Sequence, residues 1–236
     1  MKACIMCGGE GTRLRPLTFE RPKPCIPIAN RPSIVHLVTH LENFGFTDIV
    51  ITIGYLGDEI QKTLGDGSLY GATITYVPEK IKLGTAGSVK NAEEFLNDAP
   101  FLVVGGDHMT DLNVLEFYRE HMNSSAITSI GLISIEDPRE FGIAEIDASL
   151  RIRRFREKPS PGEIFSNLAS TGIYVCDPKI FEFIPKDTKF DFAKDLFPLL
   201  MEKGYQLNGW LAAETGPMSA TPQCSGLLRS GNCRRT

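Results

Sequence analysis

The 236-residue sequence lacks a long hydrophobic run, an excess of basic residues and any regular cysteine spacing. A helix that crosses a bilayer needs about 20 consecutive apolar residues, so we expect neither a membrane-spanning segment nor a membrane partner. The 25 basic and 29 acidic residues give a net charge of −4, which argues against a nucleic-acid partner. The six cysteines form no disulfide framework, and the apolar stretch Ala3–Cys7 is too short for a signal peptide. We therefore expect a cytoplasmic protein.

Several common ligand-binding motifs are also missing. Leu14 stands where the dinucleotide-binding fingerprint needs its third glycine, and no G-x-x-x-x-G-K-[ST] string occurs. Cys4 and Cys7 have the spacing of half a zinc site, but no second pair accompanies them. Residues 107–109 read Asp-His-Met, which is not the Asp-x-Asp metal motif that a glycosyltransferase would usually carry. These absences leave the dinucleotide, P-loop and zinc classes without support.

What is present is an alternation of short apolar runs with amphipathic segments of helical spacing. In the segment 33–44, for example, apolar residues recur at helical intervals between the candidate cap Ser33 and Gly45. Strands separated by helices of this length are typical of a parallel sheet with crossover helices, so we expect an α/β fold. The first half is predicted to contain strands at 2–7, 48–53, 72–77 and 101–104 and helices at 33–44, 58–64 and 86–96.

From residue 126 the pattern changes toward strands. Strands are expected at 127–135, 142–146, 151–155 and 171–176, followed by a helix at 191–203. No internal repeat or low-complexity linker appears in the chain. We therefore predict one domain with a β-rich second half.

A glycine-rich loop follows the first predicted strand, where residues 7–17 read Cys-Gly-Gly-Glu-Gly-Thr-Arg-Leu-Arg-Pro-Leu. Glycines let the backbone approach a ligand closely, and consecutive N–H groups can converge on phosphate oxygens. Arg13 and Arg15 add guanidinium groups, and Lys23 lies between two prolines. Asp107 follows another apolar run, so both features lie at carboxyl ends of predicted strands, where α/β proteins bind ligands. The sequence thus predicts one phosphate-binding site, with an ordinary glycine turn and solvated cations as the alternative.

The glycine-rich loop, together with Pro22-Lys23-Pro24, resembles the signature of the sugar-phosphate nucleotidyltransferases, or NDP-sugar pyrophosphorylases. The resemblance covers residues 1–211 and implies a Rossmann-like three-layer fold with a mixed, mainly parallel central sheet and a sugar-binding second half. It also implies a reaction in which a sugar 1-phosphate oxygen attacks the α-phosphorus of a nucleoside triphosphate and pyrophosphate leaves. The further segments that carry it are Leu83-Gly84-Thr85-Ala86-Gly87, Gly106-Asp107, Phe141-Gly142-Ile143, Glu157-Lys158-Pro159, Thr171-Gly172-Ile173-Tyr174 and Phe190–Pro198.

The resemblance assigns roles to individual residues. It implies that Arg13 grips the leaving pyrophosphate, Lys23 lies on the α-phosphate and Asp107 holds Mg²⁺. Asp107 could instead cap a turn, Lys158 could belong to a solvated strand face, and residues 84–87 could form only a turn and a helix start. The implied ligand contacts are Gly8, Gly9, Gly11, Thr12, Gly84 and Thr85 for the nucleotide, and Gly142, Glu157, Lys158 and Thr171 for the sugar phosphate.

The choice of substrates is the least determined part of the prediction. Residues 83–87 are most similar to the guanylyl-transferring branch of the family, which implies GTP and mannose 1-phosphate. Thymidylyl or uridylyl transfer to glucose 1-phosphate is the second expectation, because base choice depends on a few pocket contacts. A non-catalytic subunit that binds a sugar nucleotide and regulates a partner enzyme is the alternative from another class. A homo-oligomer is compatible with the sequence.

Residues 212–236 have a different character. The segment Gly216–Thr236 contains no acidic or aromatic residue, and the Asp-[Val/Ile]-Gly that the family places here, with a second metal carboxylate, is absent. A shifted reading frame takes the third base of each codon together with the first two bases of the next codon. From Thr215 onward, this frame can encode Trp-Ser-Asp-Val-Gly-Asn-Pro, which resembles the segment that the family has at this place. We therefore hypothesise a frame-shifted tail from about Ala213, with weak or absent activity until the frame is corrected. The alternative is a genuine loss of metal binding, and the nucleotide sequence of the gene decides between the two.

Overall fold

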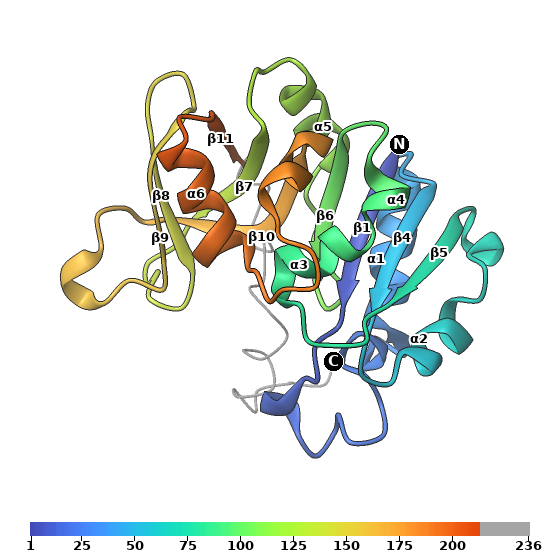
Figure 1. Ribbon diagram of the computed structural model, residues 1–236. Coiled ribbons are helices and arrows are strands. Elements are labelled where there is room, and N and C mark those ends of the chain that lie inside the picture. The colour runs from blue at the N-terminus through green and yellow to red at the C-terminus, as the bar shows by residue number, and fades with distance from the viewer. Residues whose placement is uncertain (213–236) are drawn as a thin grey trace.

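A computed structural model describes residues 1–212, and within them nine strands form one mixed sheet with helices on both faces (Figure 1). A separate ribbon joins the two-residue strands β2 (Pro27–Ile28) and β3 (Arg31–Pro32). The strands of the main sheet are β1 (Lys2–Cys7), β4 (Asp48–Ile53), β5 (Thr73–Pro78), β6 (Phe101–Gly105), β7 (Thr128–Ser134), β8 (Gly142–Ile146), β9 (Ile152–Glu157), β10 (Leu168–Cys176) and β11 (Leu207–Leu211).

The strand order of this sheet is β11-β7-β10-β6-β1-β4-β5, and β8 and β9 extend from β10 as an antiparallel hairpin. β6, β1, β4 and β5 are parallel neighbours, so their carboxyl ends lie at one edge of the sheet. β10 is antiparallel to both β6 and β7, and β11 is parallel to β7. This arrangement confirms the predicted α/β fold with a mixed, mainly parallel sheet and a β-rich second half.

The helices form a layer on each face of the sheet. One hydrophobic cluster joins α1, α2 and α5 to strand residues such as Ile5, and a second joins α3, α4 and α6 to residues such as Cys4. Because both faces of β1 are covered, its sequence is a continuous apolar run without polar alternation. The helices are α1 (Ser33–Asn43), α2 (Gly57–Leu64), α3 (Gly84–Asn91), α4 (Glu93–Leu96), α5 (Val114–Met122) and α6 (Phe197–Glu202).

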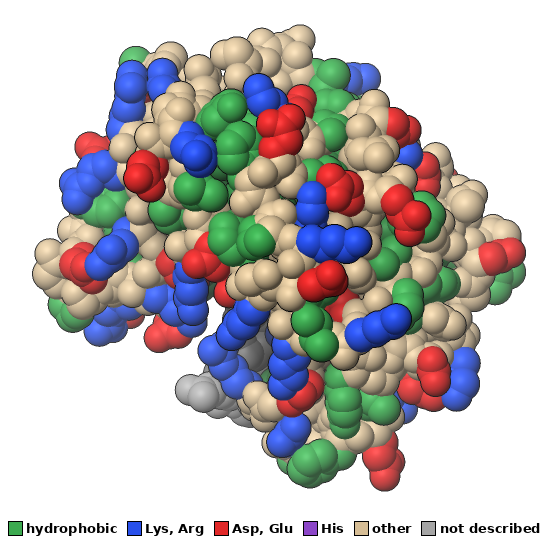
Figure 2. Space-filling model, viewed as in Figure 1, with side chains coloured by type: hydrophobic (Ala, Val, Ile, Leu, Met, Phe, Trp, Pro, Cys, Tyr) green, Lys and Arg blue, Asp and Glu red, His purple; other side chains and the backbone are tan. Residues whose placement is uncertain are grey.

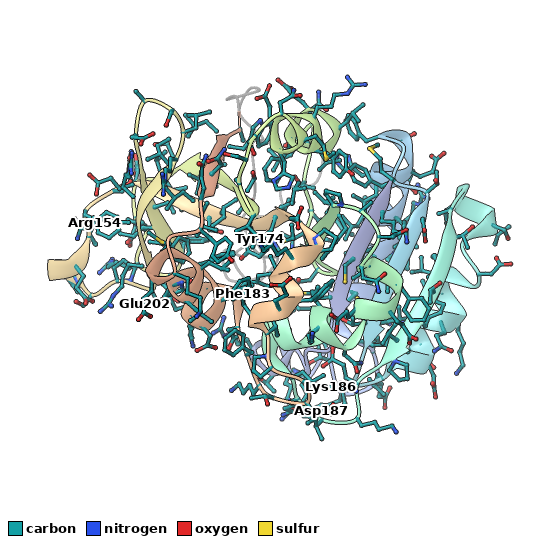
Figure 3. All side chains as sticks on the ribbon, turned by 45° about the horizontal axis from the view of Figure 1, so that its top comes forward. Arg154, Tyr174, Phe183, Lys186, Asp187 and Glu202 are labelled. Carbon is teal, nitrogen blue, oxygen red and sulfur yellow. The ribbon has the colours of Figure 1, made fainter. Side chains whose placement is uncertain are left out.

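Aromatic rings anchor the C-terminal helices to the sheet. The ring of Tyr174 in β10 lies 5.0 Å from the ring of Phe192 and 5.1 Å from that of Phe197, measured between centroids. Figure 3 shows Tyr174 in the interior of the molecule, and Lys186 and Asp187 on the loop that leads into these helices. This packing holds the segment around Phe192 against the carboxyl-end edge of the sheet, where the candidate site lies.

The structure differs from the predicted elements at a few places. The helix expected at 191–203 consists of a π-helix, Phe192–Leu196, followed by α6, because Pro198 has no N–H to continue an α-helical ladder. The helix expected at 86–96 is divided into α3 and α4. The helix α5 and the edge strand β11 have no counterpart among the predicted elements.

No helix within residues 1–212 combines the length and the apolar character needed to cross a membrane. The hypothesis of a frame-shifted tail concerns residues 213–236, which lie outside the described part of the chain. The domain limit at residue 211 stays a prediction.

Candidate active site

Two loops at the carboxyl ends of β1 and β6 meet at one cavity. Met6 pairs with Gly105 in the parallel ladder, and the Gly106 N–H donates to the Met6 carbonyl over 3.0 Å. The glycine loop after β1 and Asp107 after β6 therefore lie side by side and line a cavity of about 680 Å³. The two features that the sequence placed at strand ends are thus brought together as predicted.

The glycine-rich loop presents unused backbone donors to this cavity. The N–H groups of Gly9, Gly11 and Thr12 make no hydrogen bond within residues 1–212, and all three residues line the cavity. Gly11 has a φ of 60°, a left-handed conformation that favours glycine, and the Thr18 hydroxyl donates to its carbonyl over 2.9 Å. The loop therefore holds several N–H groups near one another, which suits a phosphate group.

Lys23 and Asp107 form an ion pair between this cavity and an adjoining one of about 390 Å³. Arg13 lines the adjoining cavity and makes no hydrogen bond or ion pair within the described residues. Burial would raise the pKa of Asp107, but the neighbouring His108 and Lys23 hold it well below its usual range. Asp107 is therefore a carboxylate at neutral pH, with cationic groups around it.

His108 is a site residue that the sequence analysis did not assign. Its Nδ1 lies 3.1 Å from the Gly105 carbonyl oxygen and its Nε2 lies 2.9 Å from the Thr171 carbonyl oxygen. The ring therefore joins the end of β6 to the neighbouring strand β10. The absence of side chains at Gly105 and Gly172 makes room for it, since a Cβ at either position would lie 2.6 Å or 2.9 Å from the ring.

The predicted sugar-phosphate residues line the far side of the same cavity. Gly142 begins β8, Glu157 ends β9, and Thr171 lies in a bulge of β10. Lys158 has a φ of 45°, and its N–H donates to the Phe141 carbonyl over 2.9 Å. This turn places Lys158 among the cavity-lining residues, where its side chain is 41% exposed, and its contact with a sugar phosphate stays a prediction.

Lys194 adds a second cation to this side of the cavity, and the sequence analysis did not assign it. It belongs to the π-helix Phe192–Leu196 and makes no ion pair within residues 1–212. Burial raises the pKa of Glu157, an effect that Lys158 and Lys194 oppose. Figure 2 shows Lys and Arg side chains gathered around the hollow in the lower part of this face. Acidic side chains such as Glu79 and Glu157 line the cavity as well, so charges of both signs meet there.

Gly84 and Thr85 lie at the start of α3 and tie it to the segment before the π-helix. Gly84 has a φ of 72°, and a Cβ there would lie 2.8 Å from the Phe190 carbonyl oxygen. The Thr85 hydroxyl donates to Asp191 over 3.2 Å and accepts the Phe192 N–H over 2.9 Å. The side chain of Thr85 is therefore engaged within the protein, and a nucleotide contact of these two residues stays a prediction.

Glu79 is a further cavity-lining residue that the sequence analysis missed. It follows β5, and its carboxylate lies against Gly8, where an added Cβ would be 2.6 Å from Oε1. The Ser88 hydroxyl of α3 donates to Glu79 Oε1 over 2.5 Å. A carboxylate is thus fixed between the glycine loop and α3, beside the predicted nucleotide contacts.

The donor set fits Mg²⁺ bound together with substrate. Mg²⁺ sites in nucleotide-using proteins commonly contain one or two carboxylates, with the remaining ligands from phosphate and water. Asp107 supplies one carboxylate at the junction of the two cavities, and no group of three or more His, Cys, Asp or Glu side chains in residues 1–212 could hold a metal ion. Asp107 is the residue that would hold the ion.

Comparison with known proteins places this geometry in a family. The nucleotidyl transferase family profile matches residues 2–214. A UTP–glucose-1-phosphate uridylyltransferase of Synechocystis is 35% identical over 219 residues, which cover 86% of this chain and 56% of the relative. A mannose-1-phosphate guanyltransferase of Debaryomyces hansenii is 36% identical over 208 residues, covering 86% of this chain and 56% of the relative. The chain spans a little over half the length of these curated relatives.

Solved structures show the same fold. A provisionally assigned glucose-1-phosphate thymidylyltransferase from Bacillus anthracis has a TM-score of 0.80 and 29% identity, covering 90% of this chain and 87% of the other. HddC from Yersinia pseudotuberculosis, complexed with GMP-PN, has a TM-score of 0.74 and 25% identity, covering 89% of this chain and 90% of the other. With a cavity built from the residues that carry the family signature, these matches lead to one conclusion: the chain belongs to the nucleotidyl transferase family.

Proposed function

We propose that this protein joins a nucleoside triphosphate to a sugar 1-phosphate, giving an NDP-sugar and pyrophosphate. The observation that carries the proposal is the single cavity of about 680 Å³, which has a phosphate-binding loop and Asp107 on one side and two lysines on the other. A site with phosphate-binding groups at both ends suits a reaction between two phosphorylated substrates. Relatives of this chain are named for such transfers.

The chemistry needs charge neutralisation more than proton transfer. The sugar 1-phosphate oxygen is already an anion, so it can form the new P–O bond at the α-phosphorus while the bond to pyrophosphate breaks. In this account Lys23 moves from Asp107 to the α-phosphate, where negative charge grows in the transition state, and Arg13 holds the leaving pyrophosphate. Mg²⁺ bound at Asp107 would neutralise phosphate oxygens when it is present.

On the other side, Lys158 and Lys194 would hold the sugar phosphate. Both line the cavity, and within residues 1–212 the one ion pair that Lys158 Nζ would have to give up is a 3.4 Å contact with the exposed Glu140. The half-buried Glu157 carboxyl group can accept hydrogen bonds from sugar hydroxyls. These groups would keep the attacking oxygen close to the α-phosphorus, which is the main contribution of positioning to such a reaction.

For the base we propose guanine, and with it GTP and mannose 1-phosphate as substrates. The Glu79 carboxylate can only accept hydrogen bonds, and its Oε2 makes none within residues 1–212. Guanine presents two adjacent donor groups, N1–H and N2–H₂, whereas uracil and thymine present one N–H between two carbonyl acceptors. A fixed carboxylate therefore favours guanine over the pyrimidines. The likeness to mannose-1-phosphate guanyltransferases supports mannose as the sugar.

Transfer from UTP or dTTP to glucose 1-phosphate is the second candidate. It is favoured by the 35% identity to the Synechocystis uridylyltransferase and by the fold shared with the Bacillus anthracis protein. The two candidates differ in base and sugar and use the same phosphate chemistry, so one assay separates them.

That assay measures pyrophosphate release for GTP, UTP, dTTP and ATP, each with mannose 1-phosphate and glucose 1-phosphate. It is run on the 236-residue chain and on a chain that carries the shifted-frame sequence after Thr215. We expect the highest kcat/KM for GTP with mannose 1-phosphate, and faster release from the corrected chain. Release that is fastest with UTP or dTTP supports the second candidate. Nucleotide binding without release from any pair, in either chain, contradicts the enzymatic proposal and supports a regulatory subunit.

A further inference from the structure

Three side chains from different elements form a buried polar chain behind the glycine loop. Thr52 lies in β4, Ser88 lies in α3, and Glu79 lies just after β5. Thr52 is fully buried and Ser88 is 3% exposed, and Ser88 and Glu79 both line the cavity. Buried hydroxyl groups in a sheet-to-helix interface cost free energy unless they are hydrogen-bonded, so their arrangement is informative.

The hydrogen bonds that join Thr52, Ser88 and Glu79 run in one direction. Ser88 Oγ lies 2.5 Å from Glu79 Oε1, and because a carboxylate only accepts, the single Ser88 proton points to Glu79. Ser88 Oγ also lies 2.6 Å from Thr52 Oγ1. Since the Ser88 proton is already used, Thr52 donates to Ser88. This series of hydrogen bonds, here called the relay, therefore ends on Oε1 of the Glu79 carboxylate.

Gly8 fixes the same carboxylate from the other side. A Cβ at Gly8 would lie 2.6 Å from Glu79 Oε1 and 2.8 Å from Oε2, so the carboxyl group occupies the space that a side chain at residue 8 would need. The second oxygen, Oε2, has no hydrogen-bond partner within residues 1–212, and no buried side-chain oxygen there lacks one. Oε2 is therefore reached by solvent, and the opening next to it is the cavity that Glu79 lines.

We propose that Thr52 and Ser88 are positioning residues that set base specificity through Glu79. By holding Oε1, they leave Oε2 as the group that faces the base and keep the carboxylate from turning away. This inference rests on the proposed function, because it takes Glu79 as the residue that contacts guanine. It adds that the preference for guanine depends on two hydroxyl groups that act through the carboxylate of Glu79.

The first test measures dissociation constants of GTP and UTP for the 236-residue chain by calorimetry, in the wild type and in Ser88→Ala and Thr52→Val. Ser88→Ala removes the charge-assisted hydrogen bond to Glu79, and Thr52→Val removes the hydrogen bond that orients Ser88. Each variant should lower the preference for GTP over UTP by about tenfold. Thr128→Val is the matched control, because Thr128 is also fully buried and its hydroxyl donates to Cys176 Sγ in β10, over 3.8 Å, away from Glu79. Its preference should stay within about twofold of the wild type.

The second test uses the geometry of an amide. In Glu79→Gln, Ser88 still donates to the oxygen, so the NH₂ group takes the position of Oε2 and presents donors to the base. We expect the preference to shift toward UTP by about 100-fold, because the N–H donors of guanine then face the N–H donors of the amide. Adding Ser88→Ala lets the amide turn over, so the double variant should recover at least about tenfold of the GTP preference.

The outcomes separate the inference from the function on which it rests. A wild-type chain that binds UTP as tightly as GTP contradicts guanine recognition by Glu79, and the inference is lost with it. A wild-type preference for GTP that persists in both Ser88→Ala and Thr52→Val, with melting temperatures close to that of the wild type, overturns the inference alone. Additive effects of Glu79→Gln and Ser88→Ala also overturn it, because a relay requires that they depend on each other.

Discussion

Replacing Lys23 by methionine should slow pyrophosphate release by about 10³-fold in whichever chain shows the activity, with a small change in the KM of the sugar 1-phosphate. The reason is that Lys23 forms an ion pair with Asp107 at the junction of the two cavities, where the α-phosphate would lie. Charge accumulates on that phosphate only as the reaction proceeds, so the loss falls mainly on kcat. The measurement is steady-state kinetics with pyrophosphate detection.

Lys62→Met is the matched control for this variant. Lys62 is an exposed lysine that pairs with Glu59 over 2.7 Å on α2, so the same substitution there should leave kcat within about twofold. Lys23→Arg keeps the charge and should retain more activity than Lys23→Met. An unchanged kcat in a folded Lys23→Met variant would exclude Lys23 from the transition state and leave it only the ion pair with Asp107.

Asp107→Asn should also abolish most activity, by about 10³-fold, and should change the response to magnesium. The carboxylate is kept ionised by His108 and Lys23, and asparagine has the same shape without the charge. We expect the rate of the wild type to rise with Mg²⁺ and saturate, and the rate of the variant to stay low at all Mg²⁺ concentrations. The measurement is a magnesium titration of pyrophosphate release, with EDTA as the metal-free reference.

The alternative role for Asp107 is the capping of a turn, and this titration tests it directly. A turn cap that binds no metal would give a variant of lower melting temperature with the same magnesium dependence as the wild type. That result would falsify the metal assignment. A variant with a melting temperature near that of the wild type and no magnesium response would support it.

The first half of the fold could be predicted from the sequence because its strands are buried on both faces. The strands Lys2–Cys7 and Asp48–Ile53 occur at the predicted positions. In an α/β pattern, a short apolar run bounded by polar residues indicates a buried strand. The α5 helix was missed, although Asn113 caps it by accepting the Glu116 N–H over 3.1 Å. That residue pair was a usable start signal. The edge strand β11 is recognisable mainly by its pairing with β7, which the sequence does not show.

The residues of the candidate site likewise fall into those that the sequence could predict and those that it could not. Residues next to strand ends, such as Gly8 and Asp107, were predictable because the ends of parallel strands converge. Glu79 and Lys194 were not, because their cavity positions depend on the loop after β5 and on a π-helix that interrupts the expected α-helix. The reason for a glycine at residue 8 is likewise tertiary, since the space beside it is filled by the carboxylate of a residue 71 positions away.

The most direct test of the account follows the α-phosphorus itself. GTP labelled with ³²P at the α-position is incubated with mannose 1-phosphate, Mg²⁺ and the protein, and the products are separated by chromatography. Attack of the sugar phosphate on the α-phosphorus predicts that the label moves into GDP-mannose while unlabelled pyrophosphate is released in equal amount. Label found in GDP or GMP, with no labelled sugar nucleotide, would contradict the proposed reaction.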